Sequence, residues 1–350
     1  NSLYTIEEKK YNVNIMLNIS HILITAKCTY FIWKDEKMEF IKSPINYTGN
    51  KYRILDQITK YFPKKVDTFV DLFSGGATVG FNVNAKKIIL IDSNEKIVNL
   101  LIYLASSEFE LLVKELEKLI KKYNLSYSAK YGYEKYKLFI DGNNGLKKYN
   151  EIGFYSLRED YSNLKNKKTK KANSMLYLLT IYGFNNDMRF NKAGNFNLPV
   201  GKTDLNKNNI KKLKDFIKRS KRINYEFIIG DFRDNHIKKI VKEAGFVYID
   251  PPYLITKATY NENGGWSEEK ERELLGLLDE IDNNNGKFVI SNILNKKNKI
   301  NIPLNEWINT KKHKVVQIDY HYRSSSYNKK NRDGSEREII VLNGDKHGNI

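Results

Sequence analysis

The sequence predicts an α/β fold: a seven-stranded, mostly parallel sheet with an antiparallel C-terminal hairpin, plus an inserted, mainly helical region that carries a β-hairpin. Three observations support this prediction. Short runs rich in Val, Ile and aromatic residues recur along the chain, helical patterns separate most of them, and a polar, Lys-rich stretch interrupts the alternation. Strands that alternate with helices favour a parallel sheet covered on both faces.

Seven segments are predicted strands because each is short, apolar and bounded by polar or glycine-containing turns. They are residues 66–73, 86–93, 225–231, 246–250, 286–292, 314–322 and 336–343. Helical patterns follow the second, third and fourth strands, at residues 94–107, 232–244 and 267–284. The last two strands have no helix between them, so we expect them to pair as an antiparallel hairpin.

The interruption divides the chain into regions. Residues 109–224 are predicted to form an insertion with its own task, and 39–108 with 225–350 are predicted to form the sheet domain. Within the insertion we expect a helix over 109–123, a basic loop over 163–174 and a helix over 175–184. The segment from Met38 resembles a natural start, so 1–38 are expected to be an N-terminal appendage.

Composition limits the function classes. The formal charge is +19, which favours a nucleic-acid partner. The Lys-, Asn- and Ile-rich composition could also come from A/T-rich coding with no partner at all. A single cysteine, Cys28, excludes an internal disulfide framework and a thiolate cluster for zinc, and fits a reducing cytoplasm. The longest N-terminal apolar run is too short to span a bilayer, so we expect no membrane association.

A glycine-containing turn follows the first predicted strand, in "FVDLFSGGATVG" at 69–80, and we expect a helix after it. Gly75 and Gly76 would let the backbone approach a ligand, although a tight turn alone could explain them. The next strand ends in Asp92, where an acid can hold both hydroxyls of a ribose. Asp71 would repel a pyrophosphate but suits a nucleoside with a cationic amine. S-adenosylmethionine is such a molecule.

The third strand closes on "GDF" at 230–232. Asp231 could accept a hydrogen bond from the amine of an adenine ring, and Phe232 could pack on the face of that ring. Asp231 could equally cap the helix that starts near Arg233. Both roles are compatible.

The segment "VYIDPPY" at 247–253 places an acid and two prolines at the end of an apolar strand. The Asp250 carboxylate and the Pro251 carbonyl are two acceptors, and neither Pro251 nor Pro252 has an amide to donate. An exocyclic aromatic amine fits this arrangement, because two acceptors can draw its nitrogen toward a tetrahedral geometry. Tyr253 then offers a surface for stacking. No metal is needed, and the alternative is a Pro-Pro turn with a capping Asp.

These motifs resemble one family. "DPPY", "DLFSGGATVG" and "INYTGNK" resemble the Dam-type DNA adenine methyltransferases that use S-adenosylmethionine, over residues 39–343. The family order of cofactor motif, recognition region and catalytic motif matches this chain. The resemblance implies double-stranded DNA as partner, a monomer in solution, and either a separately encoded restriction endonuclease or a solitary role. An Asp before the prolines favours adenine as the target.

The resemblance also implies roles for single residues. Tyr47 and Lys51 would line the cofactor and target pocket, and Asp250 would serve both the cofactor and the target amine. Asp71 and Phe73 would border the methionine part of the cofactor, and Gly75 would lie in the turn beside it. Asp92 would hold the ribose, and Asp231 and Phe232 would flank the adenine.

The segment 181–201 resembles the hairpin with which this family reads DNA. Such a ribbon fits the major groove, and Gly194 suits its tight turn. Arg189 is a candidate for a bidentate contact to guanine, and Asn191 for a contact to base or phosphate. Phe184 would fill the space beside the flipped adenine, although it could instead be a core aromatic residue.

Further DNA contacts are expected outside the hairpin's turn. They are Asn46, Asn185, Lys202, Arg323 and Arg332, with the lysine loop at 165–171 and with Lys329 and Lys330 at the rim. Each charged run could also be a solvated surface. Relatives that read GATC carry a lysine at Asn46, an apolar residue at Asp187 and an arginine at Lys202, so GATC is not assigned.

Two other functions stay open from the sequence. The same fold could methylate RNA or a protein amide, although protein-amide enzymes generally show asparagine before the prolines. A catalytically silent DNA-binding or restriction subunit is the third reading, and the intact Asp92, Asp250 and Tyr253 count against it.

Overall fold

The computed structural model describes residues 39–140, 142–256, 265–296, 299–318 and 338–343. The sheet, the insertion and the site lie in one compact unit, Ile41–Ile350. The expected appendage at 1–38, Cys28, Arg323, Arg332, Lys329 and Lys330 lie outside the described residues. The insertion and the sheet fall in the same compact unit, so the domain boundaries stay a prediction.

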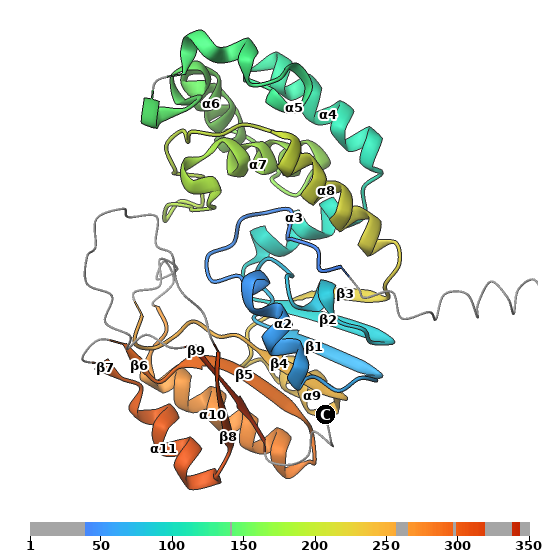
Figure 1. The fold of residues 1–350 in the computed structure, drawn as a ribbon, viewed down its shortest axis with the longest axis vertical. Coiled ribbons are helices and arrows are strands. Elements are labelled where there is room, and N and C mark those ends of the chain that lie inside the picture. Colours follow the sequence, from blue (N-terminus) through green and yellow to red (C-terminus); the bar gives the residue numbers. More distant parts are fainter. Residues whose placement is uncertain (1–38, 141, 257–264, 297–298, 319–337, 344–350) are drawn as a thin grey trace, which may run out of the picture. The chain divides into compact units, whose positions relative to one another are not determined.

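The seven predicted strands form one sheet in the order β3-β2-β1-β4-β5-β9-β8 (Figure 1). The strands are β1 (Thr68–Leu72), β2 (Lys87–Asp92), β3 (Tyr225–Ile229), β4 (Phe246–Ile249), β5 (Phe288–Ile293), β8 (Lys314–Ile318) and β9 (Glu338–Leu342). The first five are parallel, and β9 runs antiparallel to both β5 and β8. The predicted fold class and the antiparallel C-terminal pair are confirmed.

Helices cover the sheet. On one face, α9 (Asn235–Glu243), α10 (Glu268–Asn283) and α11 (Ile302–Lys311) pack on a core of Val, Ile, Leu and Phe side chains from β1, β2, β4, β5 and β9. α3 (Glu95–Ala105) contacts β3 on the way to the insertion. The Asn94 side chain accepts from the Ile97 amide at 3.3 Å and caps α3 where a strand has just ended. The three predicted helices are confirmed.

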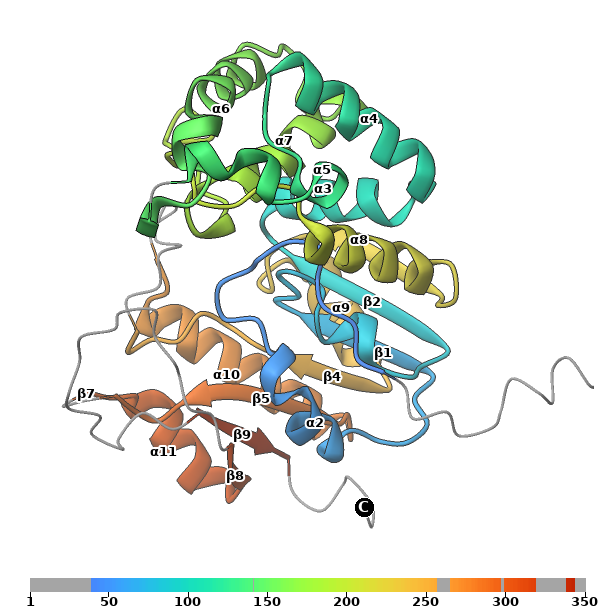
Figure 2. The ribbon, with the colours of Figure 1, turned by 45° about the horizontal axis from the view of Figure 1, so that its top comes forward.

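The insertion is helical, as predicted. Its helices are α4 (Phe109–Lys122), α5 (Ser128–Tyr131), α6 (Lys147–Ser162), α7 (Lys170–Tyr182) and α8 (Lys207–Ser220), and Figures 1 and 2 show them gathered beside the β3 end of the sheet. α7 contacts α3, α4 and α6 and lies in the middle of this group. α5, α6 and α8 were not predicted.

One boundary in the insertion was wrong. The segment 163–174 was expected to be a loop, but α7 already begins at Lys170. The Thr169 side chain accepts a hydrogen bond from the Ala172 amide at 3.1 Å and caps the start of the helix. The stabilisation from this cap outweighs the lysine-rich composition from which a loop was expected.

The expected hairpin within 181–201 is present as a narrow ribbon. Phe190 pairs with Phe196, and Gly183 with Val200, each as an isolated antiparallel bridge. Gly194 adopts φ +75°, and its amide donates to the Asn191 carbonyl at 2.8 Å to close the turn. Buried Phe residues alternate with exposed polar residues along the ribbon, so only one of its faces packs against the protein.

Short elements complete the described chain: η1 (Tyr52–Ile54), α2 (Leu55–Ile58), η2 (Thr59–Tyr61), η3 (Gly80–Asn82), η4 (Glu134–Phe139), η5 (Gly142–Asn144), η6 (Phe184–Asn186), and a two-stranded ribbon of β6 (Asn295–Lys296) and β7 (Lys299–Ile300). Within the described ranges, none of the helices has the length and apolar character required to cross a bilayer.

Candidate active site

The site lies where the order of the sheet reverses. β1 has β2 on one side and β4 on the other, and the carboxyl ends of such neighbours bind ligands in open α/β sheets. Asp250 follows β4 directly, and its amide donates to the Leu72 carbonyl at the end of β1 at 3.3 Å. Asp71 is paired in register with Tyr248, so Asp71, Tyr248 and Asp250 belong to the same face. That face is polar at this edge.

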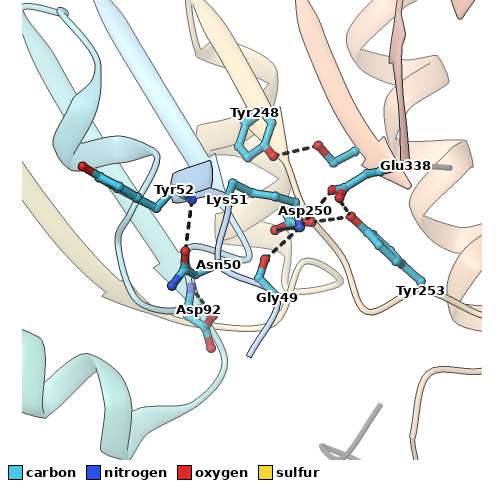
Figure 3. A network of polar contacts seen from close by, with 11 residues as sticks. Gly49, Asn50, Lys51, Tyr52, Asp92, Tyr248, Asp250, Tyr253 and Glu338 are labelled. Carbon is cyan, nitrogen blue, oxygen red and sulfur yellow. Dashed lines mark hydrogen bonds and ion pairs between the residues drawn. The ribbon is translucent and has the colours of Figure 1, made fainter. Parts of the chain in front are cut away.

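Lys51 reaches this edge from the loop before η1, and it is only 5% exposed (Figure 3). Its Nζ lies 2.8 Å from Asp250 Oδ2 and 3.2 Å from Glu338 Oε1, and it donates to the Gly49 carbonyl at 2.9 Å. One buried ammonium therefore joins two carboxylates that come from different strands of the sheet, one after β4 and one at the start of β9.

Tyr253 is buried in the same network. Its hydroxyl donates to Glu338 Oε1 at 2.7 Å and contacts Asp250 Oδ1 at 3.2 Å. Lys51 Nζ lies 5.2 Å from the centre of the Tyr253 ring. Figure 3 shows the tyrosine, the lysine and the two acids pointing toward one another. The expected stacking of a base on Tyr253 stays a prediction.

Two of the carboxylates at this edge, Asp250 and Asp71, have a raised pKa. Burial raises the pKa of Asp250 to about 6, while Lys51 lowers it and the charge of Glu338 raises it. Burial also raises the pKa of Asp71 to about 7; the hydrogen bond from the Gly80 amide lowers it, and the charges of Asp250 and Asp92 raise it. A positive ligand would relieve this repulsion, because it offsets the clustered negative charge.

The turn after β1 differs from the prediction. No α-helix follows it: residues 73–79 form successive turns that lead into η3. Phe73 and Ala77 adopt φ of 66° and 58°, a left-handed conformation that an α-helix cannot contain. The amides of Gly75 and Gly80 donate to Asp92 Oδ2 and Asp71 Oδ2, each at 2.8 Å. The acids of the motif thus hold the turn's own amides.

Tyr47 packs directly on this turn. A Cβ on Gly75 would lie 2.5 Å from the Tyr47 ring, and Gly75 itself has φ +47°. A Cβ on Gly76 would lie 3.0 Å from the Ser43 Oγ and 3.1 Å from the Tyr47 Cβ. The two glycines therefore make room for "INYTGNK", which brings Tyr47 and Lys51 to the edge of the sheet. The two sequence motifs are one structural unit.

Asp92 is buried, and both of its oxygens accept from backbone amides. Oδ2 accepts from Gly75, and Oδ1 accepts from Asn94 at 2.8 Å. Burial raises the pKa of Asp92. Each oxygen keeps a further acceptor position for a hydroxyl. The expected contact with a ribose is compatible with this geometry and stays a prediction.

An aromatic group lies beside the turn. Phe73, Phe232 and Trp266 contact one another with ring centres 5.6–5.7 Å apart. Asp231, expected to contact an adenine amine, instead forms an ion pair with Arg233, with Nε 2.8 Å from Oδ1. This pair holds the pKa of Asp231 below its usual range. Asp231 also accepts from the Arg233 amide at 3.0 Å, but α9 begins at Asn235 with Asp234 at its N-cap, so the alternative that Asp231 caps this helix is wrong.

These residues fit the group that the sequence predicts. Asp71, Asp92 and Asp250 concentrate negative charge, and the aromatic trio offers flat apolar surface for a purine. In the described turn, Ser74 Oγ and Thr78 Oγ1 are buried and have no hydrogen-bond partner. Buried hydroxyls without partners are costly, and a ligand with polar groups would satisfy them. The donor set and the surface suit a cationic nucleoside such as S-adenosylmethionine.

The predicted DNA-contact residues are partly brought together. Asn46 Nδ2 donates to the Asn185 carbonyl at 3.1 Å, although the two are 139 positions apart. Phe184 is 45% exposed, which excludes the alternative that it is a core residue. Arg189 is exposed, and its Nε donates to Asn197 Oδ1 at 2.8 Å within the hairpin. Asn185 itself adopts φ 57°.

The remaining DNA candidates are less defined. The Asn191 side chain accepts from the Asn195 amide at 3.0 Å and so turns toward its own loop. The Lys202 side chain is exposed, and its carbonyl accepts from the Leu146 amide at 3.0 Å. All of these DNA contacts stay predictions.

Two residues of the site were missed. Glu338 begins β9, and an antiparallel strand places its first residue at the edge where its parallel neighbours end. An acid at the start of the last strand was therefore a usable signal. Trp266 has no signal in the sequence beyond its place ahead of α10.

Comparisons with known proteins show the family of this chain. A model of the family described as D12 class N6 adenine-specific DNA methyltransferase matches residues 47–322. The chain is 35% identical over 318 residues to the type II methyltransferase M.FokI from Planomicrobium okeanokoites, covering 89% of this chain and 44% of that protein. It is 31% identical over 349 residues to the modification methylase StsI from Streptococcus sanguinis, covering 97% of this chain and 47% of that protein.

A third relative matches over more of its own length. The DNA adenine methylase of Salmonella typhi is 25% identical over 254 residues, covering 71% of this chain and 79% of that protein. The chain spans less than half the length of M.FokI and StsI.

Proposed function

This chain belongs to the D12 class of N6 adenine-specific DNA methyltransferases, and we propose that it transfers a methyl group from S-adenosylmethionine to the exocyclic amine of a flipped adenine in double-stranded DNA. The observation that carries the proposal is the setting of Asp250. Its carboxylate lies at the reversal point of the sheet, 18% exposed, beside a buried lysine and ahead of two prolines.

The chemistry asked of Asp250 follows from that setting. An aromatic amine is a weak nucleophile because its lone pair is delocalised into the ring. The Asp250 carboxylate and the Pro251 carbonyl can each accept one amine hydrogen, which localises the lone pair and directs it. Asp250 can also take the proton that the nitrogen must lose, since a pKa of about 6 leaves it ionised at neutral pH.

We assign the cofactor to the turn after β1. When bound, S-adenosylmethionine supplies a methyl group on a positively charged sulfur, so that a nitrogen–carbon bond forms as the carbon–sulfur bond breaks and its electron pair stays on sulfur. Asp71 and Asp250 favour that positive charge, Asp92 accepts from the ribose, and Phe73 and Phe232 border the purine. The exposed ring of Phe184 would fill the space beside the flipped adenine.

The cellular role extends the proposal. The modification methylases among the relatives support a part in restriction-modification, with a separately encoded endonuclease as the counterpart. We propose a monomer that acts on DNA in the cytoplasm. The basic net charge of +19 supports association with the DNA backbone.

The experiment is expression of the full chain in a host free of adenine methylation, followed by single-molecule sequencing of the host DNA. We expect methyladenine in one short motif, and none with Asp250→Ala. That variant should bind DNA with affinity near that of the wild type, because it removes an acceptor of the amine and leaves the hairpin intact.

Two results would count against the proposal. Methyladenine with Asp250→Ala would mean that Asp250 does not serve the reaction. Unmodified DNA with a folded wild-type chain that binds S-adenosylmethionine would mean that the acceptor is another molecule. Incubation with labelled cofactor and total RNA or protein would then identify its class.

A further inference from the structure

Glu338 belongs to the last strand of the sheet, yet it lies in the middle of the site. It is paired in register with Ile293 at the end of β5 and with Ile318 at the end of β8. Because β9 runs antiparallel, its first residue reaches the edge where Asp250 ends β4. Glu338 is 4% exposed, so its charge is held away from water.

Glu338 contacts the same two groups that contact Asp250. Lys51 Nζ is 2.8 Å from Asp250 and 3.2 Å from Glu338, while the Tyr253 hydroxyl is 3.2 Å from Asp250 and 2.7 Å from Glu338. Asp250 Oδ2 is engaged by the lysine and Asp250 Oδ1 by the tyrosine. In this arrangement both oxygens of the reactive acid already have a donor.

A target amine must therefore share Asp250 with Lys51 and Tyr253, because each carboxylate oxygen holds one of these donors and keeps one further acceptor position. Displacing a buried ammonium without offering it another acceptor would be costly, because an unpaired buried charge is strongly unfavourable. Glu338 Oε1 is within reach of both donors. Figure 3 shows the Glu338 carboxylate next to the end of Lys51 and the Tyr253 hydroxyl.

We propose that Glu338 is a positioning residue that retains Lys51 and the Tyr253 hydroxyl when the target amine takes its place on Asp250. This inference rests on the proposed function and deepens it. Glu338 need not touch the substrate. It keeps the two donors paired while the amine binds, so that Asp250 can accept the amine without leaving a buried charge alone.

The role has a consequence for pH dependence. The charged and titratable groups that face Asp250 are Lys51 before η1, Asp71 on β1, Tyr248 on β4, Tyr253 after it and Glu338 on β9. The negative charge of Glu338 raises the pKa of Asp250. Removing that charge should lower the pKa, and the acidic limb of the rate profile should move to lower pH.

The test compares Glu338→Gln with Ile340→Val in the full chain. Gln keeps an oxygen for the Tyr253 hydroxyl but has no charge for Lys51. Ile340 is fully buried on the same strand and the same side, so its truncation loosens the strand without changing charge. Single-turnover methyl transfer to DNA is measured across pH with cofactor affinity and melting temperature.

For Glu338→Gln we expect the rate to fall by up to about 10²-fold, with the acidic limb at lower pH and cofactor affinity retained. Ile340→Val should lower the melting temperature and leave the limb in place. The inference would be overturned if Glu338→Gln left the methyl-transfer rate and the acidic limb of its pH profile unchanged. It would also be overturned if Ile340→Val, at the same melting temperature, lost as much of the methyl-transfer rate as Glu338→Gln. A wild-type chain that methylates no DNA would overturn the proposed function itself, whatever the variants do.

Discussion

The edge of the sheet and the hairpin of the insertion are built in opposite ways. At the edge, Lys51 and Glu338 are buried, Asp250 is 18% exposed, and the lysine contacts both acids. On the hairpin, Arg189 and Asn197 are polar, accessible and bonded to each other. The first region holds charged groups that are largely buried, and the second keeps its polar groups at the surface.

The difference follows from what each region has to do. A reacting amine needs acceptors already in place, because rearranging them during the reaction would raise the barrier. Buried ion pairs hold such a geometry, since moving either partner exposes a charge to an apolar interior. A hairpin that reads bases has to exchange its own hydrogen bonds for those of DNA. Exposed hydrogen bonds are cheap to exchange, because water competes for them throughout.

Lys51→Met tests the edge most severely. Asp250 and Glu338 would lose their shared cation while staying buried, so we expect unfolding free energy to fall by about 3–5 kcal/mol and methyl transfer to be lost. Chemical denaturation measures the first and the DNA assay the second. Lys86→Met is the matched control, because Lys86 and Asp67 form a fully accessible pair 2.7 Å apart. Equal stability of both variants would mean that burial does not set the strength of these pairs.

Asp71→Asn tests how the buried carboxyl group of Asp71 changes the stability of the protein with pH. Folding raises the pKa of Asp71 from 3.8 to about 7, so between these values the folded chain holds a proton that the unfolded chain has lost. Unfolding then releases a proton, and the contribution of Asp71 to stability falls as pH rises through the window. Asn does not titrate. Relative to wild type, the variant should gain about 2–4 kcal/mol between about pH 4 and about pH 8.

The measurement is urea denaturation of both proteins, without cofactor, over that pH range. The amide oxygen of Asn can still accept from Gly80, so the turn should survive. Cofactor affinity should fall at the same time, because one of the acids that favour its positive charge is gone. A stability difference that does not change with pH would show that Asp71 titrates as it does in the unfolded chain.

Much of the edge could be predicted from the sequence, and the reason is local. In this chain, three buried parallel strands are apolar runs with an acid at or near their carboxyl ends. Asp71, Asp92 and Asp250 could therefore each be assigned to the end of a strand from the few residues around it. The structure brings all three to one edge. Antiparallel pairing of the last two strands followed from the lack of a helix between them.

What the sequence did not predict depends on distant or competing contacts. The helix expected after the first strand was wrong because Asp71 and Asp92 bind the amides of the turn, and such pairing across two strands is not visible in a single segment. Arg233 pairs with Asp231 where a ligand contact was expected. Glu338 reaches the site only through the register of β9 on β5, which no local pattern specifies.

Arg189→Ala tests the hairpin as a reader. If the Arg189 guanidinium gives up its hydrogen bond to Asn197 and binds the edge of a guanine, the Ala variant should discriminate less at one base pair, by about 1–3 kcal/mol. Methylation rates on a set of duplexes, each with one substituted pair, give this value position by position. Lys192→Ala removes a charge from the same turn and should lower affinity evenly across sequences. An even loss with Arg189→Ala would assign it to the backbone as well.

Gly194→Ala separates the shape of the hairpin from its side chains. Gly194 has φ +75°, and an added Cβ would meet only Lys96 Nζ at 3.8 Å, so the cost is backbone strain of about 1 kcal/mol. We expect slightly lower stability and weaker sequence discrimination with every base contact still available. Gly276→Ala is the control: this glycine lies in α10 with open space around it, so alanine should stabilise by about 0.5–1 kcal/mol. If both variants shift stability in the same direction, the turn does not require a left-handed residue, and the hairpin owes its geometry to Phe190 and Phe196 instead.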